Sequence, residues 1–217
     1  MKIDILKTTP IFKGLDENEI ESVLKSLKSR LVKYSKDEVI FETGSVIKEM
    51  ALLLSGSIHI TKLDYLGNLN IIAVIKPGDL FGESYAISIG EKLGVTALSE
   101  TDSELLMIDV SSIYSEKSLG VPGFTKFSMN LMNILAHKNI IMSKKLDHLT
   151  KRSLREKIMS YLSEISIKEN SLQFKIPLNR QQMADYLCVD RSALSRELMK
   201  LKAEGNLDYH KNIFTLK

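Results

Sequence analysis

The sequence predicts an α+β chain in three parts: a β-roll with a short N-terminal helix over residues 1–122, a long helix over 123–149, and a small helical domain with a hairpin over 150–217. Three observations predict this fold. Residues 31–110 carry short apolar runs punctuated by glycines, the long helix repeats its apolar positions with a helical period, and residues 179–204 show the caps of two short helices. Short strands with regular turns are typical of rolls and barrels, whereas a period near 3.6 residues marks a helix.

The composition indicates a soluble cytoplasmic protein whose basic charge is concentrated at one end. With a single cysteine among 217 residues, no disulfide framework is available, and no apolar run approaches the length of a membrane span. No signal-peptide pattern follows the N-terminus. Residues 151–217 contain 13 Lys and Arg against 8 Asp and Glu, and the remaining 150 residues contain 17 against 19. Such segregation favours a nucleic-acid-binding end joined to a domain with another task.

In the front half, the glycines set the spacing of the expected strands. The runs LLLSGSIHITKL, LNIIAVI, GVTAL and ELLMIDV are rich in β-branched and aliphatic residues, which favour strands. Strict alternation would put Ile58, Ile60 and Lys62 on one face of a strand and His59, Thr61 and Leu63 on the other. The expected turn glycines, Gly44, Gly56, Gly67 and Gly78, are spaced 12, 11 and 11 residues apart.

Within this sheet, the segment from Pro77 to Glu83 has the composition of a binding turn. Pro77 and Gly78 favour a turn, Gly82 allows the backbone to approach a ligand closely, and Glu83 offers an acceptor. The alternative is a structural carboxylate that caps neighbouring amides. His59 is the only histidine among residues 1–136, so we expect no metal site of clustered His and Glu side chains.

The long helix has apolar positions on two sides, which predicts two packing partners. Its own sheet can cover one stripe and a second copy of the chain the other, and a polar Asn in a dimeric seam fixes the register. One wide buried face in a monomer remains the alternative. The first stripe is Phe127, Leu131, Ile134 and Ile141, and the predicted dimer seam is Met132, Leu135, Asn139, Met142, Leu146 and Leu149.

Two capped helices joined by a tight turn are predicted between Asn179 and Gly205. Asn179 and Gln182 form a capping-box pattern, and Asp190 suits the N-cap of the second helix. Gly205 suits the position after its end. Met183, Ala184 and Leu187 give the first helix its apolar face, and Cys188 and Val189 make the turn, with Cys188 expected to be a small packed hydrophobic residue.

The second helix is predicted to lie in the major groove of DNA. Leu194, Leu198 and Leu201 fall on one side of it and the polar residues on the other, and arginine can bond two acceptors of guanine. A hairpin expected over residues 206–216 would form a wing. A solvated surface helix is the alternative for an isolated segment of this kind. The predicted base-reading residues are Arg191, Ser192, Ser195 and Arg196, and the predicted phosphate contacts are Arg180, Gln181 and Lys211.

Together these segments resemble the cyclic-AMP receptor protein and fumarate–nitrate regulator family of bacterial transcription factors. The most specific matches are GDLFGE at 78–83, RQQMA at 180–184 and DRSALSR at 190–196. The resemblance covers almost the whole chain. It implies a double-stranded β-roll of the cyclic-nucleotide-binding type, a dimerisation helix and a winged helix-turn-helix. It further implies an effector-gated homodimer that binds a two-fold symmetric operator on double-stranded DNA and works with RNA polymerase.

The departures from the family pattern concern the effector and one base contact. Cyclic-nucleotide-binding members carry arginine and serine where this chain has Leu93 and Gly94, so we expect a small-molecule effector other than cyclic AMP. Many relatives place glutamate where Ser192 stands, so the operator should differ there. The effector-site residues that the resemblance implies are Gly82, Glu83, Leu93, Gly94, Lys138 and Asn139.

The residue inventory excludes several cofactors and disfavours catalysis. An iron–sulfur cluster needs about four cysteines, and the one cysteine here rules it out. Only His59 could ligate haem from the roll, and we expect no cofactor and no metal. An enzyme would have to use Glu83 and His59 as acid and base, yet no nucleophile–base pair or phosphate-binding loop supports one. A constitutive DNA-binding protein, with the roll as a dimerisation scaffold, is the remaining alternative.

Overall fold

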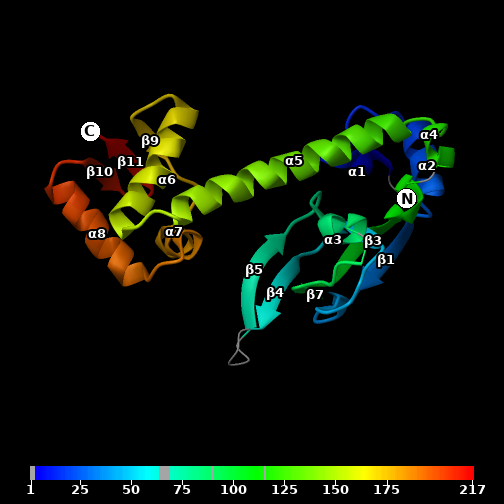
Figure 1. The fold of residues 1–217 in the computed structure, drawn as a ribbon, viewed down its shortest axis with the longest axis horizontal. Helices are drawn as coiled ribbons and strands as arrows, with labels where there is room; N and C mark the ends of the chain where they lie inside the picture. The colour runs from blue at the N-terminus through cyan, green and yellow to red at the C-terminus, as the bar shows by residue number, and fades with distance from the viewer. Residues whose placement is uncertain (1–2, 64–68, 89, 115) are drawn as a thin grey trace. The chain divides into compact units, whose positions relative to one another are not determined.

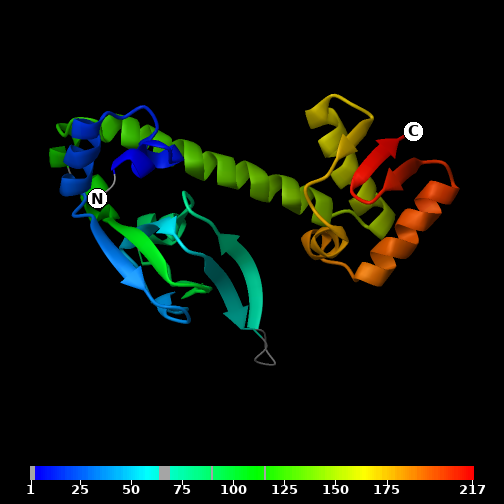
Figure 2. The same ribbon diagram turned by 180° about the vertical axis from the view of Figure 1, so that it is seen from behind.

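The computed structural model describes residues 3–63, 69–88, 90–114 and 116–217, which form two compact units that meet between Ala136 and His137 (Figures 1 and 2). This division falls inside the long helix α5 (Phe124–Leu149), whereas the sequence analysis placed boundaries on either side of it. Each unit has its own hydrophobic core.

Two short helices open the N-terminal unit. They are α1 (Ile3–Lys7) and α2 (Glu17–Ser26), with a 3₁₀ turn η1 (Pro10–Phe12) between them. Asp16 and Glu19 form a capping box that satisfies the first free N–H groups of α2. Ile20, Val23 and Leu24 then turn inward as one helical face.

Two four-stranded antiparallel sheets make the roll, as the sequence predicted. Their strand orders are β1-β8-β3-β6 and β2-β7-β4-β5. The short helix α3 (Glu83–Ile87) follows β6. The strands are β1 (Arg30–Tyr34), β2 (Val39–Phe41), β3 (Glu49–Ser55), β4 (Ile58–Leu63), β5 (Leu69–Ile75), β6 (Leu80–Phe81), β7 (Thr96–Ser99) and β8 (Ser103–Asp109).

The two faces of the first sheet are both covered. One face contributes Leu53 and Leu105 to a cluster with Phe41 and Phe81. The other contributes Leu52 to a cluster with the N-terminal helices and the start of α5. Because β3 and β8 are buried on both faces, they read in the sequence as continuous apolar runs rather than as alternating ones.

The predicted alternation along β4 is wrong beyond Ile60. The pairing of β4 with β5 shifts register between Ile60 and Thr61, and such a bulge turns the following side chains. Thr61 is consequently buried, and its hydroxyl donates to the Thr96 carbonyl over 3.3 Å. Lys62 and Leu63 are exposed.

Glycine is required at one of the predicted turns for two reasons. Gly56 has φ of 93°, and a Cβ there would lie 2.2 Å from Ser103 Oγ. Any side chain would therefore be strained and would clash. Gly44 and Gly78 also have positive φ, as the turn prediction requires, and Gly67 lies outside the described residues.

The long helix is one continuous element, as predicted, after η2 (Val110–Tyr114) and α4 (Glu116–Leu119). Phe127 and Leu131 of the first stripe are buried in the N-terminal core, and Ile134 packs partly against it. Ile141 is 48 % exposed, so the prediction of burial along the whole stripe is wrong at that residue.

The C-terminal unit adds a three-stranded sheet to the helices. Its sequence between Asn179 and Gly205 folds as predicted, but the strand β9, which pairs with β11, was not foreseen. Ile158, Leu162, Leu194, Leu198 and Phe214 lie at the centre of its core. The elements are α6 (Leu154–Glu169), β9 (Gln173–Lys175), α7 (Arg180–Leu187), α8 (Arg191–Ala203), β10 (Leu207–His210) and β11 (Ile213–Leu216).

A buried histidine joins the end of α5 to α6 within this unit. His148 is 2 % exposed; its Nδ1 lies 2.9 Å from Ser160 Oγ and its Nε2 lies 2.8 Å from a Glu164 oxygen. The Tyr161 and Tyr186 rings pack around the imidazole with centroid distances of 5.8 and 6.0 Å. Both ring nitrogens are thereby satisfied, which a buried polar group requires.

Two features that mark other classes of protein are absent from the part of the chain that the structure describes. No helix in that part is long and apolar enough to cross a membrane. Nor does that part contain a group of three or more His, Cys, Asp or Glu side chains arranged to hold a metal ion.

Candidate nucleic-acid interface and effector pocket

The two helices after Asn179 are held at their N-termini by their own side chains. Asn179 Oδ1 accepts from the Gln182 N–H and the Asn179 N–H donates to Gln182 Oε1, both over 2.9 Å. Asp190 Oδ1 accepts from the Ala193 N–H, also over 2.9 Å. These caps fix where each helix begins, and the predicted helix-turn-helix is confirmed in the C-terminal unit.

Helix α8 has one buried and one exposed face. Leu194, Leu198 and Leu201 are at most 1 % exposed. On the other side, Arg191, Ser192 and Arg196 are exposed, and Ser195 is half-buried between the two faces. The exposed face can therefore present guanidinium and hydroxyl donors to a partner without disturbing the core.

Asp190 and Ser192 are linked at the start of this helix. The Ser192 hydroxyl donates to the Asp190 carboxylate. This bond, the Ala193 N–H and the nearby Arg196 charge hold the pKa of Asp190 below its usual range. Ser192 is thus oriented by its neighbour and keeps its oxygen as a free acceptor for a base edge or a bound water.

Arg180 contacts the hairpin rather than extending into solvent. Its guanidinium carbon lies 5.0 Å from the centre of the Tyr209 ring and 5.3 Å from that of Phe214. Its Nη2 donates to the Lys211 carbonyl over 3.1 Å. Burial lowers the pKa of Arg180, and cation–π contact compensates part of the lost hydration.

The remaining predicted phosphate contacts lie on exposed surface. Lys211 is at the tip of the β10–β11 hairpin with φ of 54°, which confirms the predicted turn there. Gln181 is exposed on the first turn of α7, and its side-chain amide donates to Asp185 over 2.8 Å.

Cys188 is exposed, so the expectation of a packed hydrophobic residue is wrong. The residue ends α7 in the left-handed region with φ of 53°, and its backbone N–H donates to the carbonyls of the last turn. A C-cap in this conformation changes the direction of the chain. The Cys188 side chain therefore does not continue the buried face of α7, whose last residue is Leu187.

In the roll, Gly82 and Glu83 begin α3. Gly82 takes the left-handed conformation with φ of 78°, and a Cβ there would lie 2.9 Å from the Phe41 ring. Glu83 is 3 % exposed, and the Ser84 hydroxyl lies 3.5 Å from its Oε1. The need for glycine at this position thus comes from the Phe41 ring, and the predicted part of Gly82 and Glu83 in binding a ligand stays a prediction.

Leu93 belongs to the core between the sheets and presents no polar group. Its side chain is 5 % exposed and lies in the cluster of Phe41 and Phe81. Its backbone is bonded to the preceding loop: the Gly44 N–H donates to the Leu93 carbonyl over 2.7 Å, and the Leu93 N–H donates to the Ser45 carbonyl over 2.9 Å.

A cavity of about 370 Å³ opens beside Gly94 on the second sheet. Among the predicted effector residues of the roll, only Gly94 lines it. Of the described residues in its lining, Lys62 alone is charged. Strict alternation assigned Lys62 to the face of Ile58, so the sequence did not predict it at this site. The other lining residues are hydroxyl-bearing or apolar: Thr43, Thr61, Thr96, Leu63, Leu69 and Leu98.

The predicted seam on α5 is largely uncovered in the single chain. Met132, Met142 and Leu146 are 61, 65 and 61 % exposed, whereas Leu135 also packs partly against the N-terminal core. Leu149 is half-buried. Asn139 within the seam and Lys138 beside it are exposed, and their predicted part in an effector site stays a prediction.

His59 faces a carboxylate within the roll. Its Nδ1 lies 3.3 Å from a Glu100 oxygen, and the imidazole is largely covered. This is the environment of a structural strand residue, and it brings no nucleophile to the ring.

Two family models match the chain. A cyclic nucleotide-binding domain matches residues 31–116, and a Crp-like helix-turn-helix domain matches residues 156–217. The cyclic AMP receptor protein of Thermus thermophilus is 25 % identical over 201 residues, which are 92 % of this chain and 88 % of that protein.

Solved structures share the fold at lower identity. The catabolite activator protein of Thermus thermophilus has a TM-score of 0.58 at 22 % identity, covering 96 % of this chain and 94 % of that one. The c-di-GMP responsive global regulator CLP of Xanthomonas campestris has a TM-score of 0.58 at 19 % identity, covering 93 % and 99 %.

Proposed function

Since this chain belongs to the cyclic-AMP receptor protein and fumarate–nitrate regulator family of transcription regulators, we propose that it binds a two-fold symmetric operator as an effector-responsive homodimer. The observation that carries the proposal is the two-sided helix α8. Its buried leucines fix the helix in the core, and its exposed Arg191 and Arg196 provide donors for the major groove. Ser192, whose hydroxyl donates to Asp190, provides an acceptor beside them.

In this proposal each exposed side chain has a defined role. Arg191 and Arg196 read guanine, and Ser192 and Ser195 bond base edges or phosphates. Lys211 at the wing tip and Gln181 on α7 contact phosphates, which position the domain without reading sequence. Arg180 keeps N–H donors that the wing does not use, and these remain able to meet a phosphate.

Dimerisation through α5 follows from the exposed seam. Three apolar side chains more than half exposed on one helix are costly in water and favour burial against an identical helix. Asn139 within the seam would fix the register of the two copies. A dimer would present two α8 helices to half-sites about one helical turn of DNA apart.

We further propose that the effector is a small anion with an apolar part and not cyclic AMP. The two relatives respond, by their names, to cyclic AMP and to c-di-GMP. In this chain the apolar core side chain of Leu93 and the bare Gly94 stand where cyclic-nucleotide-binding members of the family carry arginine and serine for the phosphate. The cavity beside Gly94 instead offers Lys62, three threonines and three leucines. Gly82, Glu83, Lys138 and Asn139 are the further residues that the family pattern assigns to this function.

A constitutive DNA-binding protein is the second candidate, and the loss of the phosphate-binding pair at Leu93 and Gly94 favours it. In that case the roll would only support dimerisation, and no small molecule would change operator affinity. The family relation also implies contact with RNA polymerase.

Selection of bound sequences from a random duplex library tests the proposal without a known operator. We expect a two-fold symmetric motif to be enriched by the full-length chain. Arg196→Ala should relax one base position in each half-site, whereas Lys168→Ala on the exposed side of α6 should leave the motif unchanged. Enrichment of no sequence, or of an asymmetric one, would contradict the proposal. A thermal-shift screen of small acids against the same protein, followed by operator titration, separates a gated regulator from a constitutive one.

A further inference from the structure

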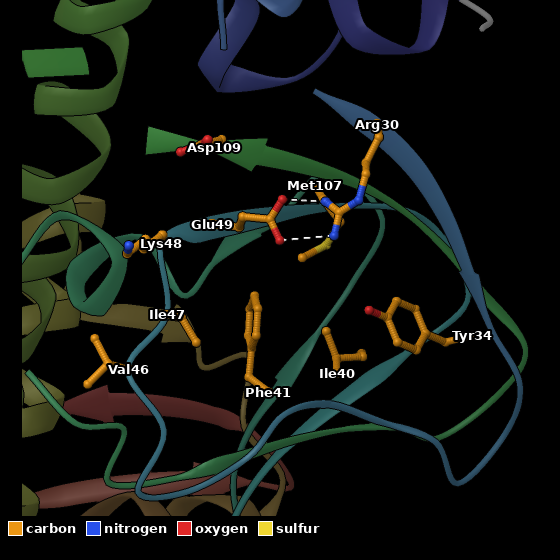
Figure 3. A pocket seen from close by; sticks show the side chains of 10 residues that line it. All are labelled: Arg30, Tyr34, Ile40, Phe41, Val46, Ile47, Lys48, Glu49, Met107 and Asp109. Atoms are coloured by element: carbon orange, nitrogen blue, oxygen red, sulfur yellow. Dashed lines mark hydrogen bonds and ion pairs between the residues drawn. The ribbon is translucent and has the colours of Figure 1, made fainter. Parts of the chain in front are cut away.

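A second cavity lies at one end of the roll, and none of the roll residues predicted for the effector lines it, although Gly82 packs against Phe41 and Ile47 of its wall. Its volume is about 470 Å³, within the range of small-molecule sites, and β1, β2, β3 and β8 contribute to its wall (Figure 3). Gly82, Glu83, Leu93 and Gly94 do not line it, and neither does Lys62. It is therefore a separate candidate.

One side of this cavity carries balanced charge. Arg30 and Glu49 form a two-pronged ion pair, in which Nη2 lies 3.0 Å from Oε2 (Figure 3). Lys48 and Asp109 lie at the same side, and Lys48 makes no ion pair with any residue that the structure describes. The wall thus holds two cations and two anions, and its net charge is zero.

The surroundings of Asp109 and Tyr34 set the charge of these two side chains at neutral pH. Burial alone would raise the pKa of Asp109, but hydrogen bonds from Ser111 and the charges of Lys28 and Lys48 outweigh it and lower the pKa. Asp109 is therefore an anion. Burial raises the pKa of Tyr34, so its phenol stays protonated and can donate a hydrogen bond.

The opposite side of the cavity is apolar. Figure 3 shows the Phe41 ring extending toward the Arg30–Glu49 pair, with Ile40 and Ile47 beside it. Phe41 is 8 % exposed, so it is fixed by the core behind it, whereas Met107 lies beside Arg30 on the charged side. This floor would accept an aliphatic or aromatic side chain of a ligand and remove it from water.

We propose that this cavity binds an apolar α-amino acid as its zwitterion. The ligand carboxylate would accept from Arg30 and Lys48, and its ammonium group would donate to Glu49 and Asp109. Its side chain would lie on Phe41, Ile40 and Ile47. A guanidinium has more N–H donors than the pair that Glu49 uses, so the ligand extends the ion pair without breaking it.

The charge balance distinguishes this ligand from others. A monoanion would gain Arg30 and Lys48 but would lie beside Glu49 and Asp109, whose like charges repel it. A monocation would gain Glu49 and Asp109 but would be repelled by the charges of Arg30 and Lys48. Only a ligand with both charged groups on one carbon atom satisfies both halves of the wall, and only one with an apolar side chain uses the floor.

Calorimetric titration of the full chain tests each part of this recognition. L-leucine, L-methionine and L-phenylalanine are the probes; isocaproate lacks the ammonium group, isoamylamine lacks the carboxylate, and glycine lacks the side chain. We expect saturable binding of at least one probe at one site per chain, and binding at least about tenfold weaker for each of the three truncated compounds. No heat from any probe, or equal affinity for a truncated compound, would overturn the proposal.

Variants locate the binding. Arg30→Gln and Glu49→Gln should each weaken binding about tenfold or more, since each removes a charge-assisted bond. Lys33→Gln, an exposed change on the same strand β1, should leave affinity unchanged. Lys48→Gln tests the wall at an exposed residue whose loss does not threaten folding. If Lys48→Gln and one of the two variants Arg30→Gln and Glu49→Gln each leave the affinity unchanged, the ligand binds elsewhere and the assignment is refuted.

Discussion

Arg180 lies over the ring of Tyr209, 5.0 Å from its centre, and its Nη2 donates to the Lys211 carbonyl at the tip of the same hairpin. One side chain at the start of α7 thereby holds both a strand and the turn of the wing. The sequence predicts a phosphate contact for this residue, and its position gives it a structural task as well.

Arg180→Ala should therefore destabilise the C-terminal unit by about 1 to 3 kcal/mol, the combined magnitude of a partly buried cation–π contact and a hydrogen bond. Arg180→Lys keeps the charge but not the planar fork, so it should recover little of this stability. Urea unfolding without DNA measures both. Arg191→Ala is the matched control, because Arg191 is exposed. Full stability of Arg180→Ala would show that the contact with the wing is incidental.

Arg196→Ala should weaken binding to the selected operator by about 1 to 3 kcal/mol and relax one base position, because the exposed guanidinium can bond two acceptors of guanine. Anisotropy titration on operators mutated one base at a time measures this. The control is Lys211→Ala, which should weaken binding evenly across sequences and reduce its salt dependence. An unchanged sequence preference in Arg196→Ala would remove this residue from base reading.

Leu146→Asp should give monomers that bind DNA poorly. The side chain is 61 % exposed in the single chain, so the substitution leaves the fold intact but places a charge in the proposed seam. Sedimentation measures the assembly state. Asn133→Asp is the control, because this exposed residue lies on the far side of α5 from the seam. A Leu146→Asp chain that still sediments as a dimer would exclude the seam as the interface.

Cyclic AMP should give no binding heat at micromolar concentration. Its phosphate would lie beside the apolar Leu93 and the bare Gly94, and neither residue has a cationic or hydroxyl group to bond it. Calorimetry on the full chain measures this, with a hit from the acid screen as the positive control for a competent protein. A clear isotherm with cyclic AMP would contradict our assignment of the effector class.

Lowering the pH should remove the contribution of Glu164 to the stability of the C-terminal unit. Burial would raise the pKa of this carboxyl, but hydrogen bonds from Lys144 and His148 outweigh it, and the net pKa is lowered from 4.5. A lowered folded-state pKa means that the stability is present above about pH 4.5 and is lost as the pH falls through the folded value. The difference in stability between wild type and Glu164→Gln should shrink over that interval. Thermal unfolding at a series of pH values measures it, and a constant difference would contradict the coupling.

The sequence allowed reliable prediction where local signals and long-range packing agree. Asn179, Asp190 and Gly205 mark the ends of α7 and α8 through hydrogen bonds within a few residues, and both helices occur there. The helical period of the apolar positions likewise located α5, because this period depends only on neighbouring residues in the sequence.

The failures arise where a distant partner decides the conformation. Strand β9 is three residues long and exists because Phe174 pairs with Phe214, forty residues away. The bulge after Ile60 depends on the register with β5, and it brings Lys62 to a cavity wall. Cys188 was expected to be buried on composition, but its place at a left-handed C-cap turns it outward.

The exposure of Cys188 also has a practical use. It is the only thiol in the chain and lies at the corner between α7 and α8. A maleimide dye or nitroxide would therefore attach at one position per subunit, without prior mutagenesis. In a dimer the pair of labels would report the spacing of the two reading heads by energy transfer or dipolar spectroscopy, with and without a small molecule.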